Sequence, residues 1–129
     1  DAKLDIFEDE LKLRQNVADR YNSLLGDMVG TPQLTSRATS SWAQYCIKLP
    51  NNSDRTAVIN YLGDNGVPTA IYYPKPMHLQ SAYLDFGDGK GSLPVSETLS
   101  ERILCLPMHP YLDQETIDSI CAHIRAALS

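Results

Sequence analysis

The chain has 129 residues, enough for one domain with its own core, and its 43% hydrophobic and 21% charged residues are typical of a globular protein. Its net charge of −5 and the scattering of its 11 Lys and Arg residues leave no basic stripe of the kind that nucleic-acid binding requires. No apolar run is long enough to cross a bilayer. We therefore expect neither a nucleic-acid partner nor a membrane partner.

The first half of the chain predicts a long helix over residues 4–25, ended by Gly26, because apolar residues recur there at helical spacing. A strand is expected within 39–50, and a second helix follows, with Ser53 as its N-cap and Gly66 at its end. The inner face of the first helix is predicted as Phe7, Leu11, Ala18, Tyr21 and Leu25, and that of the second as Ala57, Val58, Tyr61 and Leu62.

The second half predicts a strand over 67–74, a loop over 74–93, a helix that begins at Pro94, and a short strand over 103–106. Asp113 is a good N-cap for a last helix. Its inner face is predicted as Ile117, Ile120, Cys121, Ile124 and Leu128.

This order of elements predicts an α/β fold of the α+β sandwich type, with helices covering a small three-stranded sheet. We interpret residues 1–129 as a single domain, made of the long helix 4–25 and a sheet with its helices over 39–128.

The cysteines are odd in number and lie inside apolar runs, at Cys46, Cys105 and Cys121. That pattern favours buried thiols in a reducing cytoplasm over a disulfide framework. His78, His109 and Cys105 are the candidates for a metal site, but the prolines beside His109 argue against the helix that an i, i+4 pair of ligands needs. We expect no metal and no Cys–His nucleophile.

The segment 70–83, AIYYPKPMHLQSAY, has the composition of a binding site. Pro74 restricts Tyr73 to an extended backbone, and consecutive residues of a strand point to opposite faces, so at most one of Tyr72 and Tyr73 faces the core. His78 follows two prolines. Tyrosine hydroxyls and an imidazole on a stiff loop suit a ligand rich in hydroxyl or phosphate groups, although composition alone also allows ordinary surface residues.

The sequence resembles the DegT-type (StrS-type) nucleotide-sugar aminotransferases, which are fold type I enzymes that depend on pyridoxal 5′-phosphate (PLP). The resemblance lies in KLRQNVADRYNSLL at 12–25, SSWAQYCIKL at 40–49, GVPTAIYYPKPMHLQ at 66–80 and LPVSETLSERILCLPMHPYL at 93–112. It implies that the chain is the C-terminal small domain of a longer, homodimeric, cytoplasmic enzyme. The enzyme would transfer an amino group, usually from glutamate, to a UDP-linked 3-keto sugar for surface polysaccharide synthesis.

In that family a lysine of the large domain carries PLP, and the lysines of this chain lie in none of the family's PLP-lysine contexts. They are Lys3, Lys12, Lys48, Lys75 and Lys90. The resemblance therefore implies no bound cofactor, no catalytic residue and no activity for this chain alone.

The resemblance also implies substrate-binding roles. Tyr72 and Tyr73 match a pair that contacts the sugar nucleotide, although position 72 is often His in relatives, and His78 matches a loop histidine. We interpret Trp42 as a core residue and His109 as a residue that fixes a turn. The alternative function is a freestanding, non-catalytic binding or interaction module that shares this fold.

Overall fold

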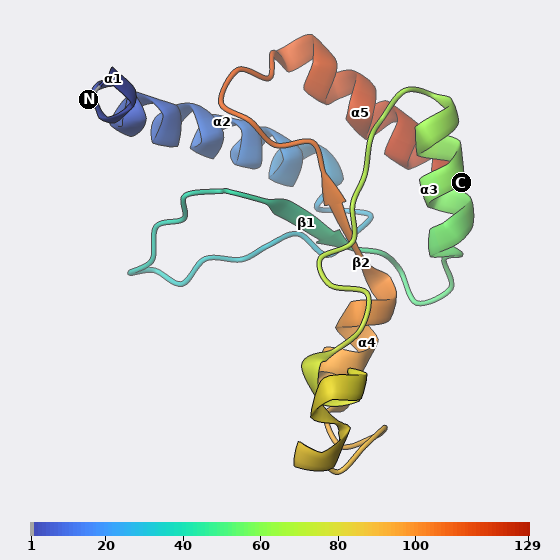
Figure 1. Cartoon of the computed structure of the whole chain (residues 1–129). Coiled ribbons are helices and arrows are strands. Elements are labelled where there is room, and N and C mark those ends of the chain that lie inside the picture. The colour runs from blue at the N-terminus through green and yellow to red at the C-terminus, as the bar shows by residue number, and fades with distance from the viewer. Residues whose placement is uncertain (1) are drawn as a thin grey trace.

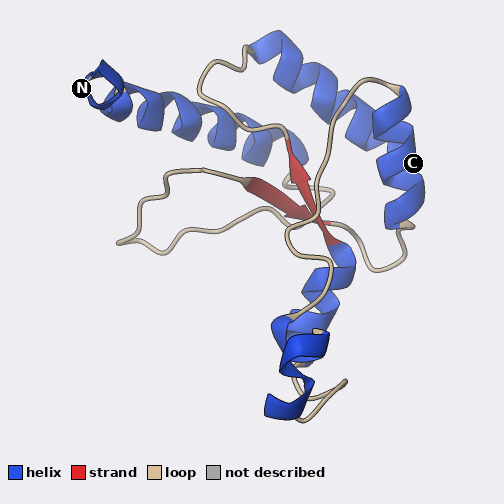
Figure 2. Ribbon diagram, in the orientation of Figure 1, coloured by secondary structure: helices blue, strands red, loops and turns tan. Residues whose placement is uncertain are grey.

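The computed structural model describes residues 2–129, with side chains from residue 4 onward, so the expectation for Lys3 lies outside the described side chains. Figure 1 shows the elements in chain order, and Figure 2 shows two strands at the centre, with the α4 region projecting away from the other helices. The elements are α1 (Ala2–Asp5), α2 (Phe7–Leu25), β1 (Tyr45–Lys48), α3 (Arg55–Asp64), the 3₁₀ helices η1 (Met77–Leu79) and η2 (Ser81–Phe86), α4 (Pro94–Arg102), β2 (Ile103–Leu106) and α5 (Gln114–Ala127).

The sheet consists of β1 and β2, which pair antiparallel with Ile47 opposite Leu104. Side chains alternate between its two faces, so Tyr45 and Ile47 of β1 are fully buried while Lys48 is exposed. The buried face packs against the helices. This part of the expected α+β architecture is confirmed.

The expectation of a three-stranded sheet is not confirmed. The segment 67–74 meets the sheet at one residue, Ala70, which exchanges backbone hydrogen bonds with Cys105 (N···O 2.8 and 3.2 Å). Pro68, two positions before Ala70, has no N–H group to donate, which explains why the ladder does not extend in that direction. The third strand is thus reduced to a single bridge.

The predicted strand 39–50 is also shorter than expected, because only Tyr45–Lys48 is extended and paired. Trp42 has a positive φ of 46°, a conformation that a strand does not contain. Its indole N–H donates to Oε1 of Gln15 (2.7 Å), and its carbonyl accepts from Arg14 (3.0 Å). Contacts with α2 therefore override the local strand preference, and Trp42 is buried, as expected for a core residue.

The long helix 4–25 is confirmed, except that its regular part begins at Phe7, after a break at Ile6. Ala18, Tyr21 and Leu25 are buried as predicted, whereas Phe7 is 50% exposed. In Figure 1 the N-terminal end of α2 extends beyond the sheet, which agrees with the exposure of Phe7 in its first turn.

The second helix has a different N-cap and a narrower inner face than predicted. Its N-cap is Asp54 rather than Ser53, because an Asp54 carboxylate oxygen accepts from two backbone N–H groups of the first turn (2.9 and 3.1 Å). The buried stripe is Val58 and Leu62. Ala57 and Tyr61, which were also predicted to face inward, directly precede Val58 and Leu62 in the sequence and are exposed.

The remaining elements agree with the sequence. The helix that begins at Pro94, the strand 103–106 and the helix after Asp113 are confirmed, and Asp113 accepts from the N–H of Thr116 (2.7 Å). In α5, Ile117, Ile120, Cys121 and Ile124 are buried, and the helix packs against α2 and α3. None of the described helices carries an apolar stretch long enough to span a bilayer.

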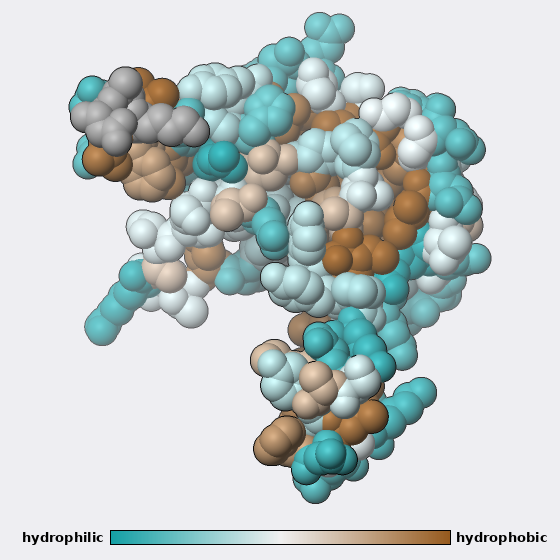
Figure 3. Space-filling model, viewed as in Figure 1, coloured by the Kyte–Doolittle hydropathy of each residue, from teal (hydrophilic) through white to brown (hydrophobic). Residues whose placement is uncertain are grey.

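The segment expected as a loop, 74–93, contains the short helices η1 and η2 and folds back onto α4. Together these residues form an arm, defined here as residues 74–102. Figure 3 shows the arm projecting from the body with apolar atoms on its visible face. Its strongly exposed apolar side chains are Met77, Phe86 and Val95.

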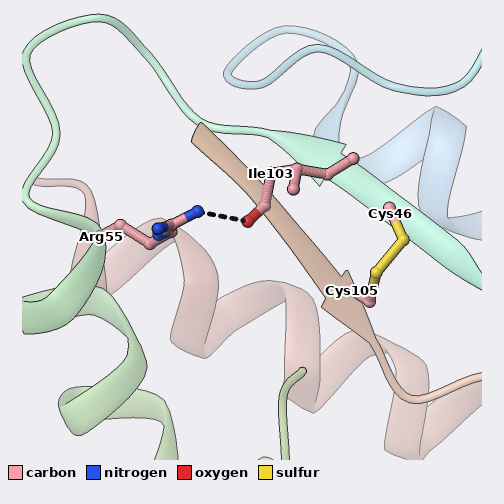
Figure 4. The surroundings of a disulfide bond; sticks show 4 residues. All are labelled: Cys46, Arg55, Ile103 and Cys105. Atoms are coloured by element: carbon pink, nitrogen blue, oxygen red, sulfur yellow. Dashed lines mark hydrogen bonds between the residues drawn. A yellow bond between two sulfur atoms is a disulfide. The ribbon is translucent and has the colours of Figure 1, made fainter. Parts of the chain in front are cut away.

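The expectation of three free thiols is wrong. Cys46 and Cys105 lie directly opposite each other in the sheet and form a disulfide across β1 and β2 (Figure 4). Because Cys105 uses both of its backbone groups to bond Ala70, the two cysteines form a non-hydrogen-bonded pair, the kind in which facing side chains approach most closely. The sequence did not reveal the pair because 59 positions separate the two residues.

Cys121 is the one free cysteine among the described residues, and it is buried in α5. Burial raises the pKa of the Cys121 thiol to about 11, so the reactive thiolate is scarce at neutral pH.

We predict three different thiol counts for the chain in a maleimide-labelling experiment followed by mass spectrometry. The native, unreduced chain reacts at no cysteine within minutes, the unreduced chain in urea reacts at Cys121 alone, and the reduced chain in urea reacts at all three cysteines. Cys121→Ser is the control, because this variant should not be labelled when it is unfolded in urea without reductant. Rapid labelling of Cys46 or Cys105 in the native, unreduced chain would show that the disulfide does not form.

Candidate functional site

A groove of about 380 Å³ lies between the segment 72–80 and α4. One wall comes from the residues that follow Ala70, where the chain leaves the sheet, and the other from the inner side of α4. Apolar side chains line most of it. The polar side chains along it are Tyr72, Tyr73, Lys75, His78, Gln80, Ser96 and Ser100.

Tyr72 and Tyr73 are both solvent-exposed, by 45% and 72%. Their rings meet edge to face with centroids 5.9 Å apart, so the expectation that they point to opposite faces is wrong. Strand alternation does not apply because this segment is not a strand. Tyr72 also lines a second cavity of about 350 Å³ on the side of Ala70 and Cys105, and therefore stands on the ridge between two hollows.

His78 lies in η1, and the structure gives it a local partner that the sequence did not indicate. Its Nε2 is 3.0 Å from Oε1 of Glu97, and the His78 side chain is only 9% exposed. An ionised carboxylate only accepts hydrogen bonds, so Nε2 of His78 must carry the proton of this contact. His78 therefore has a structural contact, and it also lines the groove.

Glu97, in the first turn of α4, contacts the groove residue His78 and was not among the residues that the sequence indicated. Its carboxylate also accepts from the N–H groups of Gly91 (2.9 and 3.0 Å) and Leu93 (3.2 Å). The hydrogen bond from His78, together with these backbone bonds, holds the pKa of the Glu97 carboxyl below its ordinary value. A glutamate in the first turn after a helix-starting proline was the available signal, since such a carboxylate often caps the helix.

The other expected residues have structural contacts. The Nδ1 atom of His109 accepts from the N–H of Tyr111 (3.2 Å), in agreement with a role in fixing a turn. His78 and His109 do not come together with Cys105, which is in the disulfide. Among the described residues no three His, Cys, Asp or Glu side chains are grouped in a way that could hold a metal.

The residues of the groove do not fit PLP as a bound cofactor. PLP enzymes need a lysine that forms the Schiff base and an acidic partner for the ring nitrogen. Lys75 lines the groove but is exposed, and Glu97 is already engaged by His78 and two backbone N–H groups. The arrangement instead presents tyrosine hydroxyls and apolar surface, which suits binding rather than covalent chemistry.

A UDP-2-acetamido-2-deoxy-3-oxo-D-glucuronate aminotransferase from Pseudomonas aeruginosa is 42% identical over 93% of this chain, which spans 32% of the relative. A UDP-N-acetyl-3-dehydro-alpha-D-glucosamine 3-aminotransferase from Acidithiobacillus ferrooxidans is 40% identical over 89% of the chain, which spans 30% of that relative.

Among solved structures, a DegT DnrJ EryC1 StrS aminotransferase from Brucella abortus is 46% identical, with a TM-score of 0.87 over 97% of this chain and 33% of its own. The chain thus spans about a third of the length of these three proteins. The model of the DegT/DnrJ/EryC1/StrS aminotransferase family matches residues 1–125. The chain therefore belongs to this aminotransferase family.

Proposed function

We propose that this chain is the C-terminal small domain of a PLP-dependent aminotransferase. That enzyme transfers an amino group, from glutamate as donor, to a nucleotide-linked keto sugar, specifically a UDP-linked 3-keto sugar used for surface polysaccharide. The single observation that carries the proposal is the match along 93% of the chain to a relative named for a UDP-linked 3-oxo sugar. A second relative named for a UDP-linked 3-dehydro sugar supports the same substrate class.

Within that enzyme the groove beside α4 supplies part of the sugar-nucleotide site, with Tyr73, Tyr72 and His78 on its wall. The geometry supports this role because Tyr73 presents a 72% exposed ring that no described contact holds to the core. A phenol hydroxyl can donate to a diphosphate oxygen or a sugar hydroxyl, and the apolar floor can cover a sugar or base face. Residues outside this chain hold PLP, the electron sink for the amino transfer.

The proposal includes a homodimeric and cytoplasmic parent enzyme. Exposed apolar side chains where α1 meets α2 are compatible with burial against the rest of such an enzyme; they are Leu4, Ile6 and Phe7.

We predict that the chain alone forms no stable aldimine with PLP. Lys12 is paired with Asp9 (Nζ···Oδ1 3.0 Å), and Lys75 lies in the open with no acid arranged for a pyridine ring. After incubation with PLP and reduction with borohydride, mass spectrometry should find only low, scattered labelling of lysines, unchanged in a Lys75→Arg variant. Stoichiometric labelling of one lysine, lost in that variant, would contradict the assignment of the cofactor to another domain.

We also predict that Tyr73→Phe in the full-length enzyme that contains this chain lowers kcat/KM for the nucleotide sugar by about ten- to a hundredfold. A hydrogen bond to a charged group contributes about 1.5–3 kcal/mol, which corresponds to that range. The variant keeps the ring and its contact with Tyr72, so folding should not change. The PLP absorbance and the half-reaction with the amino donor should also stay within twofold of the parent.

Tyr111→Phe is the matched control, because Tyr111 is an exposed tyrosine whose hydroxyl donates to Glu10 (2.6 Å) outside the groove. Loss of PLP in Tyr73→Phe, with nucleotide-sugar binding intact, would assign the segment to the cofactor instead. Equal kinetics in both variants would favour a surface without a substrate role, as in a binding module that only shares the fold.

A further inference from the structure

A single carboxylate holds the tip of the arm together. Glu97 accepts hydrogen bonds from the side chain of His78 and from the backbone of Gly91 and Leu93, and its side chain is only 13% exposed. These donors lie at the two ends of residues 78–93, with His78 at one end and Gly91 and Leu93 at the other. The Glu97 side chain therefore holds both ends of the segment 78–93 against the start of α4.

The local backbone is shaped for this contact. Gly91 has a φ of 94°, a conformation that other residues rarely adopt, and its N–H points at the carboxylate. A Cβ on Gly87 would lie 3.4 Å from the Cβ of His78, so the returning chain packs directly on the histidine. The bond to Leu93 alone would cap the helix. The additional bonds to His78 and Gly91 attach η1 and the preceding turn to the start of α4.

The additional contact matters for the groove because His78 is connected to Tyr73 by only four intervening residues, two of them prolines. Pro74 and Pro76 restrict the backbone between them, so the position of His78 limits where Tyr73 can lie. Fixing η1 against α4 in this way fixes the width of the groove, since His78 and Leu93 both line it.

We propose that Glu97 is a positioning residue for the sugar-nucleotide groove: through His78 and the Gly91–Leu93 turn it holds the wall that carries Tyr73 at a fixed distance from α4. This inference rests on the proposed function, because it gives the groove that substrate. Glu97 itself does not contact the nucleotide sugar in this account. The lowered pKa of Glu97 keeps the carboxylate ionised in the neutral range, where it can accept all of these bonds.

The test compares Glu97→Ala with Glu101→Ala, which removes an exposed glutamate from the same helix. In the full-length enzyme, Glu97→Ala should raise KM for the nucleotide sugar about tenfold, because substrate binding must then also order the wall that carries Tyr73. Its kcat and the half-reaction with the amino donor should stay within about twofold. Glu97→Ala should raise KM by a smaller factor in a His78→Ala background than in the parent enzyme, because the His78–Glu97 contact is already absent there.

A second readout does not depend on activity. Amide hydrogen exchange at Gly91 and Leu93 should accelerate about tenfold or more in Glu97→Ala and stay unchanged in Glu101→Ala. Should Glu97→Ala fail to fold, Glu97→Gln takes its place, because it keeps the side-chain length while removing the charge, and smaller changes in the same direction are expected.

Kinetics of Glu97→Ala equal to those of Glu101→Ala would overturn the proposal. A parallel loss of both half-reactions and of thermal stability would also overturn it, since Glu97 would then serve folding alone. If the enzyme accepts no nucleotide sugar while the two amides respond as predicted, the proposed function is wrong and the positioning role toward that substrate falls with it. If the amides do not respond but nucleotide sugars are used, only the role of Glu97 is wrong.

Discussion

Cys105 of β2 has a different partner on each edge of the strand. Its N–H and C=O groups exchange hydrogen bonds with Ala70, and its side chain is bonded to Cys46 of β1. Three segments that are distant in the sequence thus meet at one residue. Because Tyr72 follows Ala70 by two positions, the same bridge determines where the wall of the groove begins.

The base of the arm is tied to the body by two arginines. Arg102 donates to the carbonyl of Leu49 (Nε···O 2.8 Å), and Arg55 donates to the carbonyls of Ser100 (2.5 Å) and Ile103 (3.3 Å; Figure 4). These bonds hold the C-terminal end of α4 where it continues into β2. Glu97 acts at the other end of the helix. Hydrogen bonds thus hold α4 at both of its ends, and the groove lies between this helix and the segment that leaves the sheet at Ala70.

Elements defined by strong local signals could be predicted from the sequence. The helix from Pro94, the strand 103–106 and the Asp113 cap were all confirmed, because each depends on residues within a few positions. The strand over 67–74 was not confirmed, since a ladder requires a partner edge along its whole length, whereas this segment pairs with β2 only at Ala70 and Pro68 has no N–H group to donate. The expectation that Tyr72 and Tyr73 point to opposite faces depended on this strand and was therefore also wrong.

Only some residues of the candidate site could be predicted from the sequence, because the others depend on contacts between distant segments. Tyr73 and His78 stood out by composition and now line one groove. The His78–Glu97 contact spans 19 positions, and the Cys46–Cys105 bond spans 59, so neither follows from local spacing. Such pairs become visible only when the fold brings their elements together.

According to the proposed function, this chain belongs to an enzyme that aminates a UDP-linked 3-keto sugar. The most direct measurement follows ¹⁵N from labelled glutamate into the sugar product of the full-length protein, by mass spectrometry. The account predicts a UDP-linked 3-amino sugar that carries the ¹⁵N label, formed with one equivalent of 2-oxoglutarate. No label in the product with UDP-linked 3-keto sugars, from enzyme shown to hold its cofactor, would contradict it.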